Sequence, residues 1–242
     1  MQVLVSVRDL AEAREAAAAG VHFIDLKEPA AGALGGLPLT RVAEVVAALR
    51  NGPACGRISA TIGDWPAHEL AGILAQARDV AACGVDFVKV GVADGPAAAA
   101  LVAALGGLQA EGLPVVPVFL ADSGPAWPLL AQALGHAFPA LMLDTQDKRC
   151  GSLLARWPVA DLQRFVAEVQ AAGRLAGLAG ALQVGDAPAL RRLAPDFAGF
   201  RSAVCAGDRA GALDAGRVAG LLALWPDDAG RRSAEGLVAR PG

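Results

Sequence analysis

Several residue types are scarce in this sequence, and each shortage excludes a class of protein. The 242 residues include no tyrosine, three histidines and four cysteines, and the net charge is −3. The cysteines (Cys55, Cys83, Cys150 and Cys205) lie far apart, without the paired spacing of zinc sites and disulfide frameworks. No apolar run has the length and character of a membrane span, and no basic block offers a surface to nucleic acid. We therefore expect no metal, no disulfide, and neither a membrane nor a nucleic acid as partner.

Apolar side chains are abundant: they make up 55% of the sequence, whereas charged residues make up 19%. This composition excludes disorder, and a chain of this length buries roughly 70% of its unfolded surface without needing disulfides. The first residues have the pattern of a strand rather than of a secretory leader, so we expect a cytoplasmic protein. Alanine-rich helix faces permit a homo-oligomer without requiring one.

Strand-like and helix-like segments alternate along the chain. Short β-branched and apolar runs with little polar alternation indicate strands buried on both faces, as in parallel sheets. The expected strands are residues 3–7, 23–27, 57–63, 87–91, 115–121, 140–145, 175–182 and 197–204. The expected helices are residues 9–19, 40–50, 67–83, 96–110, 125–137, 159–172, 187–193 and 215–224.

Eight strand–helix units predict a (β/α)8 TIM barrel, an α/β fold in which residues 1–226 form a single catalytic domain. A doubly wound open sheet is the alternative, but the GxGxxG fingerprint and the P-loop are both absent from the sequence. We expect no cofactor. Residues 227–242 are polar and rich in arginine and glycine, which predicts a polar C-terminal tail.

Lysine is the most informative shortage. Three of the 21 basic residues are lysines, namely Lys27, Lys89 and Lys148, and the others are arginines. Arginine does not lose its proton at accessible pH, whereas a lysine amine can, so these positions are candidates for a site that needs a neutral amine. Compositional bias is the alternative explanation, and the placement of the lysines has to decide between the two.

The lysines and two aspartates fall at the carboxyl ends of even-numbered strands, where the active sites of this barrel lie. Asp25 and Lys27 share one face of the second strand, Lys89 lies near the end of the fourth, Asp144 ends the sixth, and Lys148 follows it. A lysine among other cations and apolar walls can form a Schiff base with a carbonyl, after which a base removes the α-proton. The simpler alternative is that each lysine is a surface residue or half of a buried ion pair.

The loops after the seventh and eighth expected strands have the composition of an anion site. Such loops commonly bind phosphate in this fold, and beside the lysines they suggest a phosphorylated carbonyl compound as substrate. The alternative is that their glycines serve only tight turns. The candidate residues are Gly180, Ala181, Arg201, Ser202, Gly207, Asp208 and Arg209.

Taken together, these residues make the chain resemble the (5-formylfuran-3-yl)methyl phosphate synthases, also called 4-(hydroxymethyl)-2-furancarboxaldehyde phosphate synthases, of methanofuran biosynthesis. The resemblance covers most of the chain, and its most specific elements are the DxKxP motif at 25–29 and the KVG motif at 89–91. The other matching segments are Leu4-Val5-Ser6, Gly32 with Leu34-Gly35, Ser59-Ala60-Thr61-Ile62-Gly63-Asp64, Leu143-Asp144-Thr145 with Lys148, Leu178-Ala179-Gly180, Gly199-Phe200-Arg201 and Gly207-Asp208-Arg209.

The resemblance implies a lyase that condenses two molecules of glyceraldehyde 3-phosphate into a phosphorylated furan aldehyde, with loss of phosphate and water. It implies that Lys27 forms the Schiff base, that Lys89 transfers protons, and that Asp25, Asp144 and Lys148 assist. One departure is Ala181, where a serine is expected, so the phosphate contact of that hydroxyl is missing from this chain.

Two other functions stay open on the residues alone. A class I aldolase or isomerase of another phosphosugar would form the same Schiff base but release no phosphate. A barrel without activity that senses a phosphorylated metabolite would bind it through Lys89 without turnover. The fold by itself supports all three functions equally.

Overall fold

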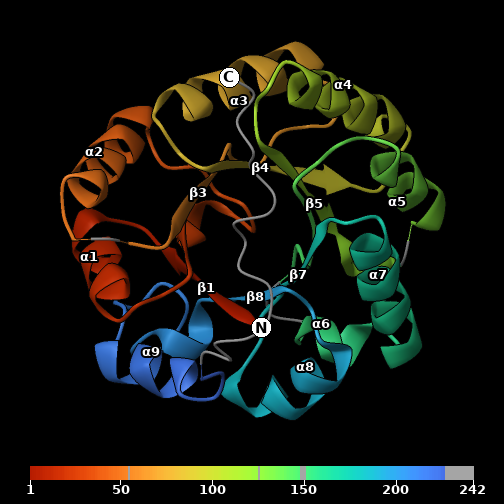
Figure 1. Cartoon of the computed structure of the whole chain (residues 1–242). Coiled ribbons are helices and arrows are strands. Elements are labelled where there is room, and N and C mark those ends of the chain that lie inside the picture. The colour runs from red at the N-terminus through yellow and green to blue at the C-terminus, as the bar shows by residue number, and fades with distance from the viewer. Residues whose placement is uncertain (54, 125, 148–150, 227–242) are drawn as a thin grey trace.

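The computed structural model of the protein describes residues 1–53, 55–124, 126–147 and 151–226. Its centre is a closed barrel of parallel strands that follow one another in chain order, with β8 pairing back onto β1. Figure 1 looks along the barrel and shows the helices as an outer ring. This confirms the (β/α)8 barrel and excludes the open sheet. The strands are β1 (Gln2–Val7), β2 (Phe23–Leu26), β3 (Arg57–Thr61), β4 (Phe87–Ala93), β5 (Val115–Leu120), β6 (Ala140–Asp144), β7 (Leu175–Leu178) and β8 (Phe197–Phe200).

Helices connect the strands on the outside of the barrel. Asp9 begins the first of them by accepting a hydrogen bond from the backbone N–H of Glu12, as an N-cap residue does. None of the described helices is long and apolar enough to cross a membrane. The α-helices are α1 (Leu10–Ala18), α2 (Leu39–Arg50), α3 (Leu70–Ala82), α4 (Ala98–Ala110), α5 (Trp127–Leu134), α6 (Leu153–Arg156), α7 (Val159–Ala171), α8 (Ala187–Leu193) and α9 (Ala215–Leu222); the 3-10 turns are η1 (Pro29–Ala31), η2 (Ala121–Ser123), η3 (Val184–Asp186) and η4 (Ser202–Val204).

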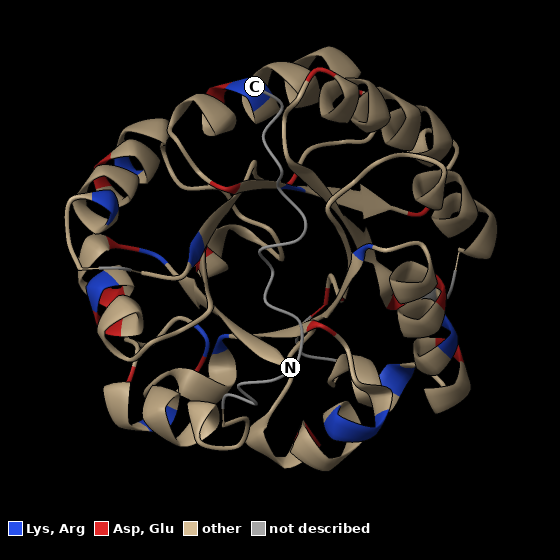
Figure 2. Cartoon of the chain, in the orientation of Figure 1, with Lys and Arg blue, Asp and Glu red and all other residues tan. Residues whose placement is uncertain are grey.

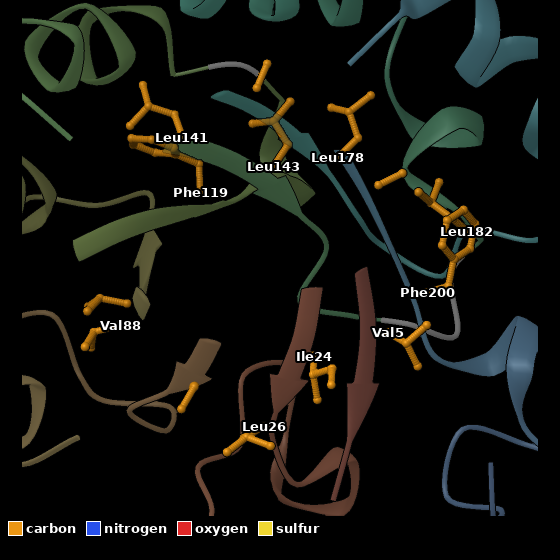
Figure 3. Close-up of a cluster of buried hydrophobic side chains, with 14 of the residues drawn as sticks. Val5, Ile24, Leu26, Val88, Phe119, Leu141, Leu143, Leu178, Leu182 and Phe200 are labelled. Atoms are coloured by element: carbon orange, nitrogen blue, oxygen red, sulfur yellow. The ribbon is translucent and has the colours of Figure 1, made fainter. Parts of the chain in front are cut away.

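The main hydrophobic core lies between the strands and the helices. Strand residues such as Val5, Ile24 and Leu141 share this core with helix residues such as Leu101 and Phe165. Figure 3 shows part of this cluster, with side chains from several strands turned toward the surrounding helices. Because successive strand residues point to opposite faces, the intervening residues of each strand point into the barrel.

The interior of the barrel changes character along the strands. At the amino end it is aromatic: the Phe23 ring lies 5.2 Å from Phe197 and 6.2 Å from Phe87, between ring centroids. Two residues further along β2 and β4, the same faces carry Asp25 and Lys89. Strand alternation therefore places charged side chains inside the barrel at its carboxyl end.

The largest differences from the predicted boundaries are at the ends of β7 and β8. β7 ends at Leu178 and β8 at Phe200, whereas the apolar runs predicted strands to residues 182 and 204. The runs continue because the loops beyond these strands are themselves buried, as Leu182 is. The short helix α6 was not predicted, because four residues are too few to show a helical period. The predicted tail, residues 227–242, lies outside the described residues.

Candidate active site

Asp25 is the centre of a buried polar cluster at the carboxyl end of the barrel. Its Oδ1 accepts hydrogen bonds from Lys89 Nζ at 3.0 Å and from Ser59 Oγ at 2.7 Å. Its Oδ2 accepts a hydrogen bond from Ser6 Oγ at 3.1 Å. Ser6 and Ser59 are the residues that pair with Asp25 across the sheet, on β1 and β3. Four adjacent strands therefore converge on one carboxylate.

The surroundings of Asp25 keep it ionised. Burial alone raises the pKa of this carboxyl, which is 0% exposed. The positive charges of Lys89 and Lys27, with the hydrogen bonds from Ser59 and Lys89, lower the pKa by more than burial raises it. The net result is a pKa below the ordinary value, so Asp25 is a carboxylate at neutral pH.

Lys27 follows directly after β2 and lies beside the same carboxylate. Its side chain is buried, and its Nζ donates to the carbonyl of Ala33 at 3.3 Å. Ala33 belongs to the loop between η1 and α2, which Asp64 holds by accepting a hydrogen bond from the N–H of Leu34. Lys27 and Lys89 are 6% and 3% exposed, so neither is a surface lysine. Lys89 does form a buried ion pair, as the simpler alternative suggested, and its partner is Asp25.

A cavity opens above this cluster. Its volume is about 420 Å³, counting the part open to solvent. Asp25, Lys27, Lys89 and Asp144 all line it, so the structure brings four of the five predicted catalytic residues together. Asp144 ends β6, is 2% exposed, and accepts a hydrogen bond from the N–H of Thr145. Figure 2 shows other charged residues on the outer helices and on the loops that join them to the strands.

The loop after β7 forms one wall of the cavity through Gly180 and Ala181. Both residues have positive φ, at +109° and 50°. A side chain on Gly180 would lie within 3.0 Å of Thr145, so only glycine fits there. Ala181 is a non-glycine residue in the left-handed region, and such strained positions are frequent at functional sites.

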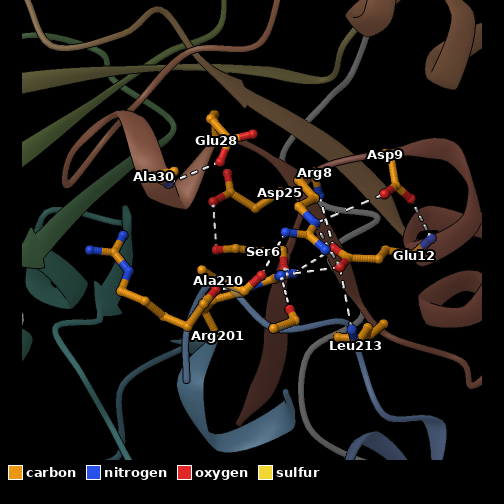
Figure 4. Close-up of polar contacts among 12 residues, drawn as sticks. Ser6, Arg8, Asp9, Glu12, Asp25, Glu28, Ala30, Arg201, Ala210 and Leu213 are labelled. Carbon is orange, nitrogen blue, oxygen red and sulfur yellow. Dashed lines mark hydrogen bonds and ion pairs between the residues drawn. The ribbon is translucent and has the colours of Figure 1, made fainter. Parts of the chain in front are cut away.

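The two arginines of the predicted anion site have different surroundings. Arg209 is half-buried at the cavity, where one N–H donates to the carbonyl of Gly32 at 3.1 Å. Arg201 also touches the cavity, but its guanidinium forms a buried ion pair with Glu12 and donates to backbone carbonyls. Figure 4 shows Arg201 and Glu12 in one polar network with Arg8. Ser202 lines the cavity beside Arg201.

Two of the predicted residues do not line the cavity. Gly207 and Asp208 are exposed and do not line it; the Asp208 carboxylate instead accepts from the N–H groups of Ala210 and Gly211. Lys148 lies outside the described residues. Within the described ranges, no group of three or more His, Cys, Asp or Glu side chains could hold a metal ion.

A family model described as 4-HFC-P synthase matches residues 3–222. The chain belongs to this family. It is 41% identical over 209 residues to a Methylorubrum extorquens protein provisionally named (5-formylfuran-3-yl)methyl phosphate synthase, covering 86% of this chain and 84% of that one. It is 36% identical over 70 residues to the (5-formylfuran-3-yl)methyl phosphate synthase of Archaeoglobus fulgidus, covering 29% and 30% of the two chains. Members of the 4-HFC-P synthase family are thus enzymes, and the resemblance inferred from the motifs is confirmed.

Solved barrels agree with the fold of this 4-HFC-P synthase family member. Phosphoribosyl anthranilate isomerase from Thermus thermophilus aligns with a TM-score of 0.62 at 21% identity, covering 93% of this chain and 98% of that one. 3-Hexulose-6-phosphate synthase from Salmonella typhimurium aligns with a TM-score of 0.61 at 18% identity, covering 92% and 99%. At these identities the likeness concerns the fold alone.

Glu12 is the polar residue of the site region that sequence reasoning missed. It lies on α1, is 5% exposed, and pairs with Arg201, which is 189 residues away. Its one local signal is helical spacing, because Glu12 lies on the same buried face as Ala13 and Ala16. Its partner could not be inferred from that spacing.

Proposed function

We propose that the chain is a (5-formylfuran-3-yl)methyl phosphate synthase acting in the biosynthesis of a methanofuran-type cofactor. Two molecules of glyceraldehyde 3-phosphate supply the six carbons of the furan aldehyde. One phosphate and two water molecules leave, so the reaction needs no oxidant or reductant. Its substrate is small and soluble, which agrees with a cytoplasmic location. Family membership supports the product, and the buried pair Lys27 and Lys89 around Asp25 is the observation that carries the chemistry.

The contacts of the two lysines support different roles. Lys89 Nζ donates a hydrogen bond to the Asp25 carboxylate at 3.0 Å, and Lys89 is the proposed proton-transfer residue. Lys27 lines the cavity beside the same carboxylate, and its Nζ donates to the carbonyl of Ala33 rather than directly to Asp25 in the hydrogen bond shown, so its amine is the proposed nucleophile. In the proposed reaction the Lys27 amine attacks the carbonyl carbon, water leaves, and a protonated imine forms.

The imine acidifies the neighbouring carbon because it accepts electrons. Asp144 lines the same cavity as Asp25 and is the proposed base for that carbon, with Lys148 assisting. We assign the substrate phosphates to the wall formed by Gly180, Ala181 and Ser202, together with Arg209. Backbone N–H groups there would replace the hydroxyl that Ala181 lacks.

Borohydride trapping tests the Schiff base. Borohydride with glyceraldehyde 3-phosphate should attach a reduced adduct to Lys27 of the wild type, detected by peptide mass spectrometry. Lys27→Arg keeps the positive charge but cannot form an imine, so the adduct should vanish and turnover should fall by more than about a thousandfold. Lys89→Arg is the matched control, because it should still permit the adduct at Lys27. An adduct in Lys27→Arg, or an adduct only at another lysine, would overturn the assignment.

A product assay separates the proposed enzyme from the alternatives. The synthase releases one inorganic phosphate for each furan formed, and the furan aldehyde absorbs in the ultraviolet. A phosphosugar aldolase or isomerase would release no phosphate, and a sensing barrel would bind the triose without turnover. Phosphate and furan appearing together in equal amounts are the expected result.

A further inference from the structure

The loop that carries Arg209 is held by a cluster formed by the buried residues Glu12 and Arg201 and the partly exposed Arg8, which we call the Arg8–Glu12–Arg201 clamp. The Glu12 and Arg201 side chains are each 6% exposed and form a two-pronged ion pair, with N–O distances of 2.5 and 3.1 Å. Arg8 adds a second contact to Glu12 at 3.3 Å. Such two-pronged pairs fix orientation as well as charge.

The clamp holds a continuous stretch of the loop by its backbone. Arg201 Nε donates to the carbonyl of Arg209 at 2.9 Å, and Arg201 Nη2 donates to that of Gly211 at 2.7 Å. Arg8 Nη1 donates to the carbonyl between them, that of Ala210, at 2.6 Å. Three consecutive carbonyls of the loop are therefore fixed by two arginines.

Glu12 also holds the end of this loop directly, because its carboxylate accepts a hydrogen bond from the backbone N–H of Leu213. The clamp also touches the catalytic cluster: Arg201 Nη1 donates to the carbonyl of Ser6 at 3.0 Å, and Ser6 Oγ donates to Asp25. Figure 4 shows this connection from Asp25 through Ser6 to Arg201 and Glu12. The loop and the catalytic carboxylate are thus fixed to the same guanidinium.

We propose that Arg8, Glu12 and Arg201 are positioning residues, which fasten the 209–213 loop so that the Arg209 guanidinium stays at the cavity to bind a substrate phosphate. Arg201 itself does not bind the phosphate, because each of its nitrogens donates to a protein acceptor, namely Glu12 or a backbone carbonyl. This assigns a supporting role to a residue that the sequence suggested as a phosphate ligand. The inference rests on the proposed function only in taking the substrate to be a phosphate ester.

The test measures binding of inorganic phosphate by calorimetry, so it does not depend on turnover. Arg209→Met should weaken phosphate binding by about tenfold or more, since a charge-assisted hydrogen bond is lost. Glu12→Gln should weaken it by about threefold to tenfold and Arg8→Met by about threefold, because the guanidinium is then no longer held in place. The double variant Glu12→Gln with Arg209→Met should bind no more weakly than Arg209→Met alone.

Asp86→Asn is the matched control. Asp86 also accepts from an arginine, Arg50, and from a backbone N–H, that of Ile58, but it lies just before β4 at the opposite end of the barrel. It should leave phosphate binding unchanged. In the assay with glyceraldehyde 3-phosphate, the clamp variants should raise the apparent KM by the factor seen for phosphate and change kcat by less than about threefold, as expected for loss of uniform binding.

Circular dichroism and thermal unfolding identify variants that do not fold. If Glu12→Gln does not fold, phosphate binding by Arg8→Met tests the proposal instead. The proposal is overturned if the folded clamp variants bind phosphate like the wild type, if their effect persists in the Arg209→Met background, or if the wild type binds no phosphate. Failure of the proposed synthase activity would be seen separately: no furan would form, while the phosphate-binding results would still be as expected.

Discussion

The two ends of the barrel interior are buried to a similar degree but are chemically opposite. At the amino end, Phe23, Phe87 and Phe197 fill the interior with rings that are 4% to 8% exposed. At the carboxyl end, Asp25 and Lys89 are 0% and 3% exposed. On β2 and β4 the two kinds of residue are separated by a single outward-facing position. Burial alone therefore does not determine what an interior position contributes.

The two ends differ in how much the burial of their side chains stabilises the fold. Burying an aromatic ring stabilises the fold by about 1.5–3 kcal/mol relative to leaving it exposed. Burying a charge pair is at best close to neutral, and apolar replacements of such pairs are often as stable. The aromatic end stabilises the barrel, whereas the proposed chemistry explains the charged end. Variants at the two ends should separate stability from activity.

The largest effect is expected at the charged end. Lys89→Met should lower kcat by about 10²–10⁴-fold, the usual range for losing a proton-transfer group. It should also destabilise the fold, because Asp25 loses one of its two cationic neighbours. Steady-state furan formation at saturating substrate measures the loss. A variant that keeps more than about a tenth of wild-type kcat would show that Lys89 does not transfer protons.

The aromatic end should show the reverse. Phe23→Ala removes a ring that contacts both Phe87 and Phe197, so it should lower the free energy of unfolding by about 3–5 kcal/mol. Because the ring does not line the cavity, kcat/KM of the folded fraction should change by less than about threefold. Urea unfolding gives the first quantity and kinetics below the melting temperature the second. A large loss of kcat/KM would contradict the separation of the two ends.

A smaller effect concerns pH. The pKa of Asp25 is lowered in the folded state, so its ionised form contributes stability above the ordinary pKa of about 4, and this contribution is lost as pH falls below that value. The difference in unfolding free energy between wild type and Asp25→Asn should therefore be constant from neutral pH to about pH 5 and narrow below about pH 4. For Phe23→Ala the corresponding difference should not depend on pH. Urea midpoints at pH 7, 5 and 3.5 compare the two.

The smallest effect is expected outside the barrel. Arg78 and Glu111 form an ion pair at 2.8 Å whose side chains are 48% and 54% exposed. Arg78→Ala should change the unfolding free energy by less than about 1 kcal/mol, because solvent and salt screen such pairs. It should leave kinetics unchanged. If its effect approached that of Phe23→Ala, exposure would be a poor guide to energy in this molecule.

The sequence predicted the barrel and most of the buried polar cluster at its carboxyl end because both depend on local patterns. Strand starts such as Phe23, Phe87 and Phe197 follow from apolar runs bounded by turns. Strand alternation alone then places Asp25 and Lys89 inside the barrel. Lysine scarcity singled out Lys27 and Lys89 before any contact was known, and the structure places both at one cavity.

What the sequence could not predict depends on contacts between distant residues. Arg201 follows a barrel strand as a phosphate ligand would, and only the position of Glu12 shows that its guanidinium is already engaged. Asp208 has the same local context as Arg209, yet its side chain caps its own turn while Arg209 reaches the cavity. These outcomes depend on loop conformation, which residue spacing does not determine.

The scarcity of lysine also gives the chain an unusual proteolytic map. An endoprotease that cuts only after lysine would divide the denatured protein into four pieces, with junctions after Lys27, Lys89 and Lys148. An adduct on one of these amines blocks the cut at that junction. The sizes of the uncut fragments on a gel would therefore reveal which lysine had captured the substrate, without sequencing a peptide.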